Sequence, residues 1–338
     1  WINGQTSGTS SDGKGLNFWS GAATTYVKVS ATGTAGNIKL SGSASTTTMP
    51  GVGINWARIL SSGGSVTIDS GTNPTTFGAS SASSAVYVGA ESAGGATGDI
   101  HLNASGFTFA GTANFRTTGS MTVDSGSAQS FSGAQTFAAA SFIVNDVANF
   151  RIGNAGTNSS TQNHVNVTIS SPIAATGAIE IYGADVAANG NLTTSTASVL
   201  LLKGTGNVSI GAGVSATRRA ITTAGGPITL WSNADASGLG AVSINNYVDV
   251  SSGAGAILIA GSATSSESSP TGYATAGTGD WGVAIGSSAV ATDSVKLTTT
   301  SGDITVRGKI QSTNGIGIGV AVVSGANITS TTGAISID

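Results

Sequence analysis

The chain repeats one short pattern of hydrophobic and polar positions. The phrase "TSGDITVRG" at 300–308 returns as "TAGNIKLSG" at 34–42, "ATGDIHLNA" at 96–104 and "STTGAISID" at 330–338. The common form is G-x-Φ-x-Φ, where Φ is an aliphatic residue. The copies begin at Gly36, Gly64, Gly98, Gly119, Gly177, Gly206, Gly226, Gly240, Gly255, Gly302 and Gly333. Strict alternation over so few residues predicts short β-strands with one buried face.

The alternation also assigns each side chain to a face of its strand. The aliphatic residues expected to point inward include Ile38, Val66, Ile100, Val208, Ile304 and Ile335. The polar residues between them, which we expect on the outer face, include Lys39, Thr67, Glu180 and Thr305. A strand of about five residues cannot bury its apolar face alone, so each copy needs neighbours.

The spacing between copies of the phrase indicates which strands become neighbours. Many copies recur after about thirty residues, a period typical of solenoids. Shorter intervals indicate that the phrase occurs on more than one side of a coil. We therefore predict an all-β parallel β-helix of about eleven coils of roughly 30 residues, with helix nearly absent. We expect the glycine before each strand to supply a sharp corner, often with positive φ, and Asn and Ser near the corners to add side-chain ladders.

Three segments depart from the repeat and are expected to be loop excursions, near 41–58, 130–146 and 261–281. Loops on a solenoid commonly carry binding residues, so Trp56, Tyr273 and Trp281 are the candidate binding residues. The alternative is that each aromatic residue folds back onto the solenoid. The phrase "ANFR" occurs at 113–116 and 148–151. We expect Phe115 and Phe150 to stack on adjacent coils as an internal aromatic ladder.

Composition narrows the classes of partner. The 338 residues carry a net charge of −3, and the 12 Lys and Arg residues are scattered, so nucleic-acid binding is not expected. No Cys and only two His occur, which leaves no disulfide framework, no metal signature and no expected cofactor. No apolar run reaches about 18 residues, so membrane insertion is not expected.

Enzymatic chemistry is the main alternative from another class. Some parallel β-helices act on polysaccharides through clustered charged residues on one outer face. Asp99 and His101 share an outer face, but Asp69 and Asp124 each precede Ser-Gly and are typical of turns. No two carboxylates lie two residues apart on one predicted strand. We therefore expect no enzyme and no catalytic residue, and keep a carbohydrate-active β-helix enzyme, or less favoured an ice-binding solenoid, as the alternatives.

At "TSGDITVRG" and "TTGAISID" the chain resembles the repeat shaft of filamentous-haemagglutinin-like adhesins, which are large bacterial exoproteins. The resemblance covers nearly the whole length and concerns the Gly-x-Φ-x-Φ phrase, the Ser, Thr and Asn turns, and the lack of Cys. It implies a right-handed parallel β-helix, export to the bacterial cell surface, and adhesion or biofilm formation. The partners implied are host or neighbouring cell surfaces or glycans. The family's Asn-Pro-Asn motif is approached only by Asn73-Pro74-Thr75, and no functional residue carries over.

We therefore expect 1–338 to be a single continuous β-solenoid segment of a longer or polymerised protein, serving as an adhesin shaft or surface filament subunit. Ile335 and Ile337 follow the interior pattern up to Asp338. This pattern predicts that the last coil is continued by more of the same polypeptide or by the first coil of the next subunit, in an open fibre.

Overall fold

A computed structural model describes residues 2–5, 14–20, 25–78, 85–95, 98–125, 133–153, 165–277, 280–287, 294–311, 317–323 and 325–338. The chain divides into two compact units. Unit 1 comprises Trp1–Asn154 and Ser171–Ala175, and unit 2 comprises Ala155–Ser170 and Thr176–Asp338. A single continuous solenoid over 1–338 stays a prediction.

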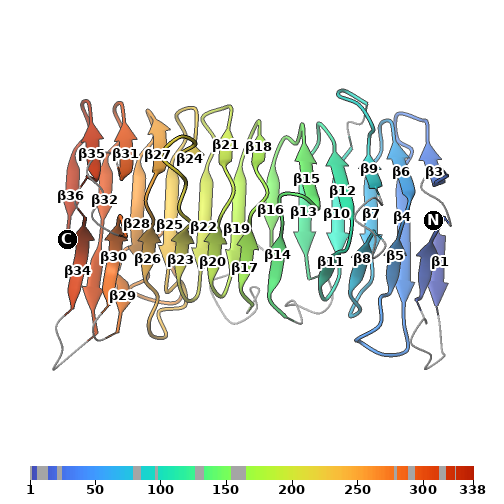
Figure 1. Cartoon of the computed structure of the whole chain (residues 1–338), viewed down its shortest axis with the longest axis horizontal. Helices are drawn as coiled ribbons and strands as arrows, with labels where there is room; N and C mark the ends of the chain where they lie inside the picture. Colours follow the sequence, from blue (N-terminus) through green and yellow to red (C-terminus); the bar gives the residue numbers. More distant parts are fainter. Residues whose placement is uncertain are drawn as a thin grey trace. The chain divides into compact units, whose positions relative to one another are not determined.

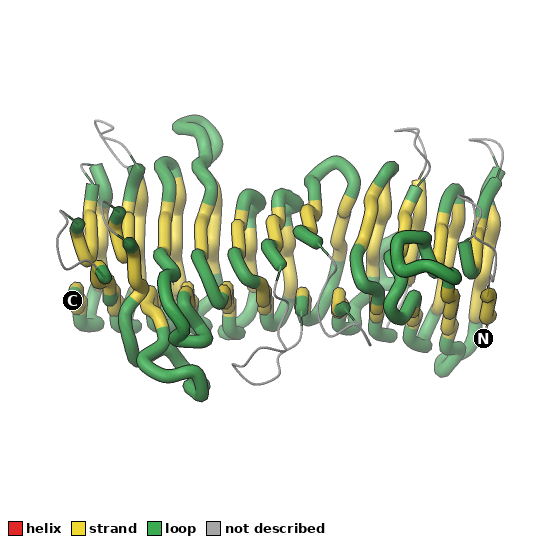
Figure 2. The backbone as a smooth tube through the Cα atoms, turned by 90° about the horizontal axis from the view of Figure 1, so that it is seen from below, coloured by secondary structure: helices red, strands yellow, loops and turns green. Residues whose placement is uncertain are grey.

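Both units are built from short parallel strands, as the repeat predicts. Figures 1 and 2 show strands and loops, and none of the described residues is helical. No helix within the described ranges is therefore long and apolar enough to cross a membrane. Strands from successive repeats pair in parallel, for example Ile38 with Val66 and Ile304 with Ile335. The architecture within each unit is that of a β-solenoid.

Unit 1 contains three sheets whose neighbouring strands come from successive turns of the chain. The first has the order β1 (Ile2–Gln5), β4 (Ile38–Ser43), β7 (Val66–Asp69), β10 (Ile100–Asn103), β13 (Met121–Asp124) and β16 (Phe150–Ile152). The second contains β2 (Leu16–Phe18), β5 (Val52–Ile54), β8 (Thr75–Phe77) and β11 (Phe107–Phe109). The third contains β3 (Val27–Ala31), β6 (Ala57–Ser61), β9 (Ala85–Gly89), β12 (Thr112–Arg116) and β15 (Phe142–Asn145). The unit also includes β14 (Gln135–Phe137) and β18 (Ile173–Ala175).

Unit 2 repeats this plan with three sheets and one short addition. The first sheet contains β19 (Ile179–Gly183), β22 (Leu200–Gly204), β25 (Ile228–Ser232), β28 (Ile257–Gly261), β32 (Ile304–Val306) and β36 (Ile335–Ile337). The second contains β17 (Val167–Ile169), β20 (Val186–Ala188), β23 (Val208–Ile210), β26 (Val242–Ile244), β30 (Trp281–Ile285) and β34 (Ile318–Val322). The third contains β21 (Leu192–Thr194), β24 (Arg219–Thr222), β27 (Val248–Gly253), β31 (Val295–Thr299) and β35 (Asn327–Ser330). The addition is a two-stranded sheet of β29 (Ala274–Ala276) and β33 (Gly308–Ile310).

The predicted division into inner and outer faces is confirmed with one exception. The inward residues Ile38, Val66, Ile100, Val208 and Ile304 are buried. The outward residues Lys39, Thr67, Glu180 and Thr305 are exposed or half-buried. The exception is Ile335, which is 45% exposed although it pairs in register with Ile304. It lies on β36, the outermost strand of its sheet, so only one neighbouring coil covers it.

The shorter spacings have the predicted cause. The copies that begin at Gly206 and Gly240 form β23 and β26, which lie in the second sheet of unit 2. The copies at Gly226 and Gly255 form β25 and β28 in the first sheet. One phrase therefore serves two sides of the same coil.

The glycines that open the repeats have a different role from the predicted one. Gly226, Gly255 and Gly302 do not adopt positive φ. Instead they stack directly on one another: a Cβ on Gly255 would lie 2.2 Å from the carbonyl oxygen of Gly226, and a Cβ on Gly302 would lie 1.9 Å from that of Gly255. Glycine is required because neighbouring coils approach too closely to admit a side chain.

Side chains at the corners tie each coil to the next, as expected for Asn. In unit 2, Asp185 Oδ1 accepts the backbone N–H of Asn207 at 2.7 Å, and Asn207 Oδ1 accepts that of Ala241 at 2.9 Å. Asp303 Oδ1 accepts the N–H of Ala334 in the same way at 2.8 Å. These bonds satisfy backbone donors at the corners, where the sheet ladders are interrupted.

The aromatic core of unit 1 corrects the interpretation of the "ANFR" repeat. Phe115 and Phe150 are both buried, but Phe115 lies on β12 in the third sheet and Phe150 on β16 in the first. Phe115 is in register with Val88 and Val144, so the predicted ladder of the two phenylalanines is wrong. Both rings contact Phe142, with centroids 5.2 Å and 6.2 Å away. The two copies of the tetrapeptide therefore lie in different sheets, on two sides of the coil.

The three predicted excursions contain more strand than expected. Residues 41–58 include β5 and the start of β6, and only 44–51 form a long connection. Within 130–146, β14 and the whole of β15 are strands whose Phe137 and Phe142 are buried, while 130–132 lie outside the described residues. Residues 262–273 leave the regular coil of unit 2, and β29 follows them.

Candidate functional site

The three aromatic candidates have different surroundings. Trp56 belongs to unit 1 and occupies the corner between β5 and β6 with φ of 50°, half-buried, and its carbonyl accepts the N–H of Val27 at 2.9 Å. Positive φ is unfavourable for a bulky residue and persists only where the surrounding structure enforces it. We therefore interpret Trp56 as a residue that shapes the corner and not as a binding residue. Tyr273 and Trp281 belong to unit 2, and are 39% and 37% exposed. They flank β29, the strand carried by the third excursion.

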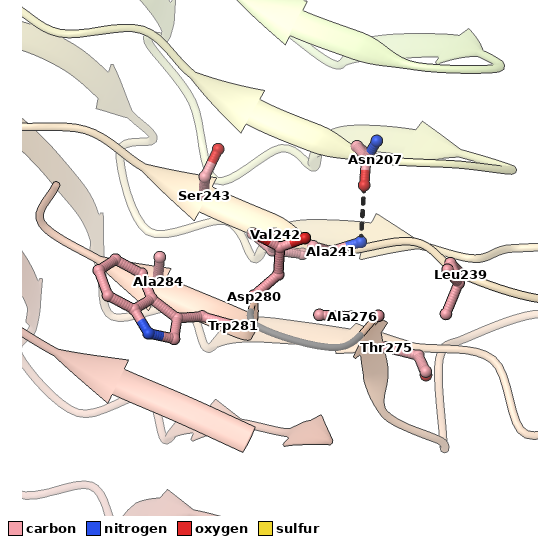
Figure 3. A pocket seen from close by; sticks show the side chains of 11 residues that line it. Asn207, Leu239, Ala241, Val242, Ser243, Thr275, Ala276, Asp280, Trp281 and Ala284 are labelled. Carbon is pink, nitrogen blue, oxygen red and sulfur yellow. Dashed lines mark hydrogen bonds between the residues drawn. The ribbon is translucent and has the colours of Figure 1, made fainter. Parts of the chain in front are cut away.

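Two grooves lie beside β29. The Trp281 groove has a volume of about 530 Å³ and is bordered by β26, β29 and the start of β30. Its lining residues are Asn207, Leu239, Ala241, Val242, Ser243, Thr275, Ala276, Gly277, Asp280, Trp281 and Ala284. In the view of Figure 3, Trp281 and Leu239 lie at opposite ends of the groove, with Val242, Ala241 and Ala276 between them.

The Tyr273 groove lies beside the same strand and also has a volume of about 530 Å³. Thr275 contributes to both grooves. The Nζ of Lys309 is 5.9 Å from the centroid of the Tyr273 ring, and Asn233 and Gln311 also line this groove. The lining of the Tyr273 groove is therefore more polar and includes a cation, whereas the described residues that line the Trp281 groove include none.

Backbone bonds fix β29 in place. Thr275 donates its N–H to the carbonyl of Gly240 at 2.8 Å and accepts the N–H of Gly240 at 2.8 Å. On its other side β29 pairs in parallel with β33, with Thr275 in register with Lys309. The strand is thus held to two coils of unit 2. A site built on strands held in this way is pre-organised for a ligand.

Glu267 organises the loop that leads into β29. Its carboxylate accepts the N–H groups of Ala263 at 3.0 Å, Thr264 at 3.1 Å and Thr271 at 3.0 Å, and the Thr271 hydroxyl at 2.6 Å. Partial desolvation raises the pKa of this carboxyl, but the bonds from Thr271, Ala263 and Thr264 outweigh it and hold the pKa below its usual value. The ionised carboxylate therefore closes the loop.

The base of the excursion is fixed to a buried row on the first sheet of unit 2. Trp231 donates its indole N–H to Ser262 Oγ at 2.8 Å, and Ser262 donates to the carbonyl of Ala234 at 3.1 Å. Lys203 is in register with Trp231, and its Nζ is 3.9 Å from the Trp231 ring centroid. Lys203 is only 6% exposed, and burial lowers its pKa from 10.5 to about 8.

This buried lysine predicts a pH-dependent stability. Because the folded pKa is below the unfolded one, the folded state binds fewer protons between about pH 8 and 10.5, and Lys203 adds stability as the pH rises through that window. We expect the wild-type chain to gain about 2–3 kcal/mol from this group over the window, and Lys203→Met to lose that gain. The measurement is urea unfolding of unit 2 from pH 7 to 11. Lys309→Met, at an exposed position of unit 2, is the control that should retain the gain. Equal pH profiles for wild type and Lys203→Met would contradict the prediction.

The residues considered for catalysis have structural partners in unit 1. Asp99 Oδ1 accepts the N–H of Ser120 at 2.8 Å, and its other oxygen is 3.9 Å from Nε2 of His101. Asp69 accepts the N–H of Gly71 at 3.1 Å, and Asp124 that of Ser125 at 2.7 Å, as expected for turns. Within the described part of the chain, no group of three or more His, Asp or Glu residues is arranged to hold a metal ion.

Sequence reasoning selected Tyr273 and Trp281 but not their neighbours in the grooves. Asn207 and Ser243 belong to ordinary copies of the repeat, and nothing in the sequence distinguishes them from other corner and outward residues. For Leu239 the sequence did contain a clue, because an apolar residue is unusual within a polar corner. In the structure its side chain is 53% exposed. Asn207, Ser243 and Leu239 lie near Trp281 because the strands of three successive coils pair side by side.

Comparison with protein-family models, curated proteins and solved structures finds no match for this chain.

Proposed function

We propose that this chain is a non-enzymatic, extracellular structural and adhesive solenoid of a bacterial surface, similar to the shafts of filamentous-haemagglutinin-like adhesins. In this proposal the solenoid is right-handed, with about eleven coils of roughly 30 residues. Its partners are host or neighbouring cell surfaces or glycans. The parallel repeat, the small polar outward side chains and the absence of Cys support it.

The observation that carries the adhesive part is the pair of grooves beside β29. Most apolar side chains on the inner coils of unit 2 are buried, but Tyr273 and Trp281, at the end of the excursion, are 39% and 37% exposed. An exposed aromatic residue in a formed groove is the usual sign of a binding surface. A regular solenoid in which one irregular segment forms a groove is suited to attachment to another surface.

The lining of the Trp281 groove favours binding over the enzymatic alternative. Glycoside hydrolysis commonly requires two carboxyl groups flanking the bond to be cleaved. Asp280 is the single carboxylate among the described residues that line this groove. A groove with one carboxylate and an aromatic wall can hold a ligand without providing that pair.

The proposed function is tested with beads that carry the whole chain. We expect the beads to attach to bacterial or epithelial cell surfaces, and to release no reducing sugar from a panel of polysaccharides. Bare beads are the control. Turnover of a polysaccharide that is lost in Asp280→Asn, or in Asp99→Asn together with His101→Ala, would replace the proposal by the enzymatic alternative.

End-to-end association forms part of the same proposal. Ile335 and Ile337 on β36 are 45% and 46% exposed, and Ile318 and Val322 on β34 are 47% and 46% exposed. Apolar strands of this kind are complementary to a further coil. We expect the chain to form end-to-end species at high concentration, and Ile335→Lys to suppress them because the charge would be buried in the junction.

Analytical ultracentrifugation measures this association. The control is Ser336→Lys, which adds the same charge between the two isoleucines on the outward face of β36. A wild-type chain that stays a single monomeric species over the whole concentration range, or equal effects of the two lysines, would contradict the prediction.

A further inference from the structure

The Trp281 side chain remains accessible where its strand neighbours are buried. Val283 and Ile285 on the same strand are fully buried, whereas Trp281 is 37% exposed and forms part of the groove wall. A flat indole face next to small residues such as Ala276 and Ala284 leaves room for a planar or ring-shaped ligand. Aromatic faces of this kind pack against the C–H-bearing faces of sugar rings.

Polar groups suited to hydroxyl ligands border the same space. Ser243 and Asn207 line the groove and carry a hydroxyl and an amide group, whereas the buried Thr275 hydroxyl donates to the carbonyl of Tyr273 at 3.0 Å. Asn207 uses its carbonyl oxygen for the N–H of Ala241, and in the view of Figure 3 its amide nitrogen points away from Ala241, so this side chain serves to hold the corner of the groove. The exposed Asp280 carboxylate can accept hydrogen bonds from hydroxyl groups.

The charge of the residues that line the groove distinguishes anionic from neutral ligands. Asp280 is an acid, and the eleven described residues that line the groove include no Lys, Arg or His. A phosphorylated, sulfated or uronic-acid ligand would meet an uncompensated negative charge. A neutral polyhydroxylated ligand would meet the Asp280 carboxylate as an acceptor, the Ser243 hydroxyl and an aromatic face. These features match an uncharged saccharide better than an anionic one.

We infer that the Trp281 groove binds a neutral saccharide, with the Trp281 indole as the stacking face and with Asp280 and Ser243 as partners of the sugar hydroxyls. This inference rests on the proposed adhesive function and names the ligand class for its groove. The bonds between Thr275 and Gly240 hold β29 in place, so the groove is formed before the saccharide binds.

The test measures binding of defined hexasaccharides to the whole chain by isothermal titration calorimetry. The neutral probes are cellohexaose, maltohexaose and fully N-acetylated chitohexaose, and the charged probes are hexagalacturonate and a heparin hexasaccharide. We expect at least one neutral probe to bind more tightly than all charged probes. Trp281→Ala should weaken it by about tenfold, the loss of one aromatic stacking contact. Trp19→Ala is the matched control, since Trp19 is 64% exposed and belongs to unit 1, and it should bind like the wild type.

A second readout does not depend on how the alanine variant folds. The indole N–H resonance of Trp281 in the wild-type chain, assigned by its loss in Trp281→Phe, should shift on addition of the bound saccharide, while that of Trp19 should not. The inference is overturned if none of the neutral probes binds, if binding is unchanged in Trp281→Ala, or if a charged probe binds most tightly.

The bead assay separates this inference from the proposed function. Wild-type beads that attach to cells, with no neutral probe bound, would overturn the saccharide ligand and support the adhesive function. Trp281-dependent binding of a neutral probe, without attachment of the beads to any cell surface, would support the ligand and overturn the adhesive function.

Discussion

Replacement of Phe142 by alanine is expected to lower the free energy of unfolding of unit 1 by about 3–5 kcal/mol. The Phe142 ring is fully buried, and its centroid is 5.1 Å from that of Phe109, 5.2 Å from Phe115 and 4.8 Å from Phe137. These rings project from different strands, so the cavity left by alanine would remove contacts that join the sides of the coil. Urea unfolding followed by hydrogen exchange in unit 1 measures the change.

Ile143→Ala is the matched control for this prediction. Ile143 follows Phe142 on β15 but is half-buried on the opposite face. We expect its replacement to be less destabilising than Phe142→Ala, because fewer contacts are lost. Equal losses for the two variants, or a loss under about 1 kcal/mol for Phe142→Ala, would show that the aromatic cluster does not support unit 1.

The second large effect is expected at the stacked glycines of unit 2. Gly255→Ala should lower the free energy of unfolding by about 3 kcal/mol, because the new methyl group would overlap the backbone of Gly226. The added Cβ would be 2.2 Å from the carbonyl oxygen of Gly226 and 2.3 Å from its carbonyl carbon. Neither atom belongs to a side chain that can rotate away, so neighbouring coils must separate.

Gly238→Ala provides the comparison. An added Cβ at Gly238 would meet no atom within 4 Å, and the backbone there does not have positive φ. We expect the unfolding midpoint of this variant in urea to equal that of the wild type. A Gly255→Ala variant as stable as Gly238→Ala would mean that close stacking of coils is not the reason for glycine in the repeat.

The sequence predicted the strands that carry the full phrase, and it missed many of the others. The alternation at Ile38 and Leu40, or at Ile304 and Val306, was sufficient to place both the strand and its inward face. Strands such as β8 and β21 have only three residues, with one apolar side chain each, which is too short for alternation to be recognised. Their positions are fixed by pairing with the neighbouring coil, a non-local effect.

The glycine and phenylalanine corrections have a common cause. Stacking of Gly255 on Gly226 and the placement of Phe115 and Phe150 in different sheets depend on how coils of unequal length align. A repeated motif indicates that local structure recurs, but it does not indicate which copies become neighbours. The same limit applies to the Trp281 groove, where the exposed aromatic residue was predicted and the opposing Leu239 and Asn207 were not.

The central claim, that this chain forms an extracellular structural and adhesive solenoid, is tested most directly by immunogold electron microscopy of intact cells that produce the protein, using antibodies against this chain. The account predicts gold particles outside the cell envelope, on surface filaments or on the outer surface. Gold confined to the cell interior, in cells where permeabilisation is required for labelling, would contradict it.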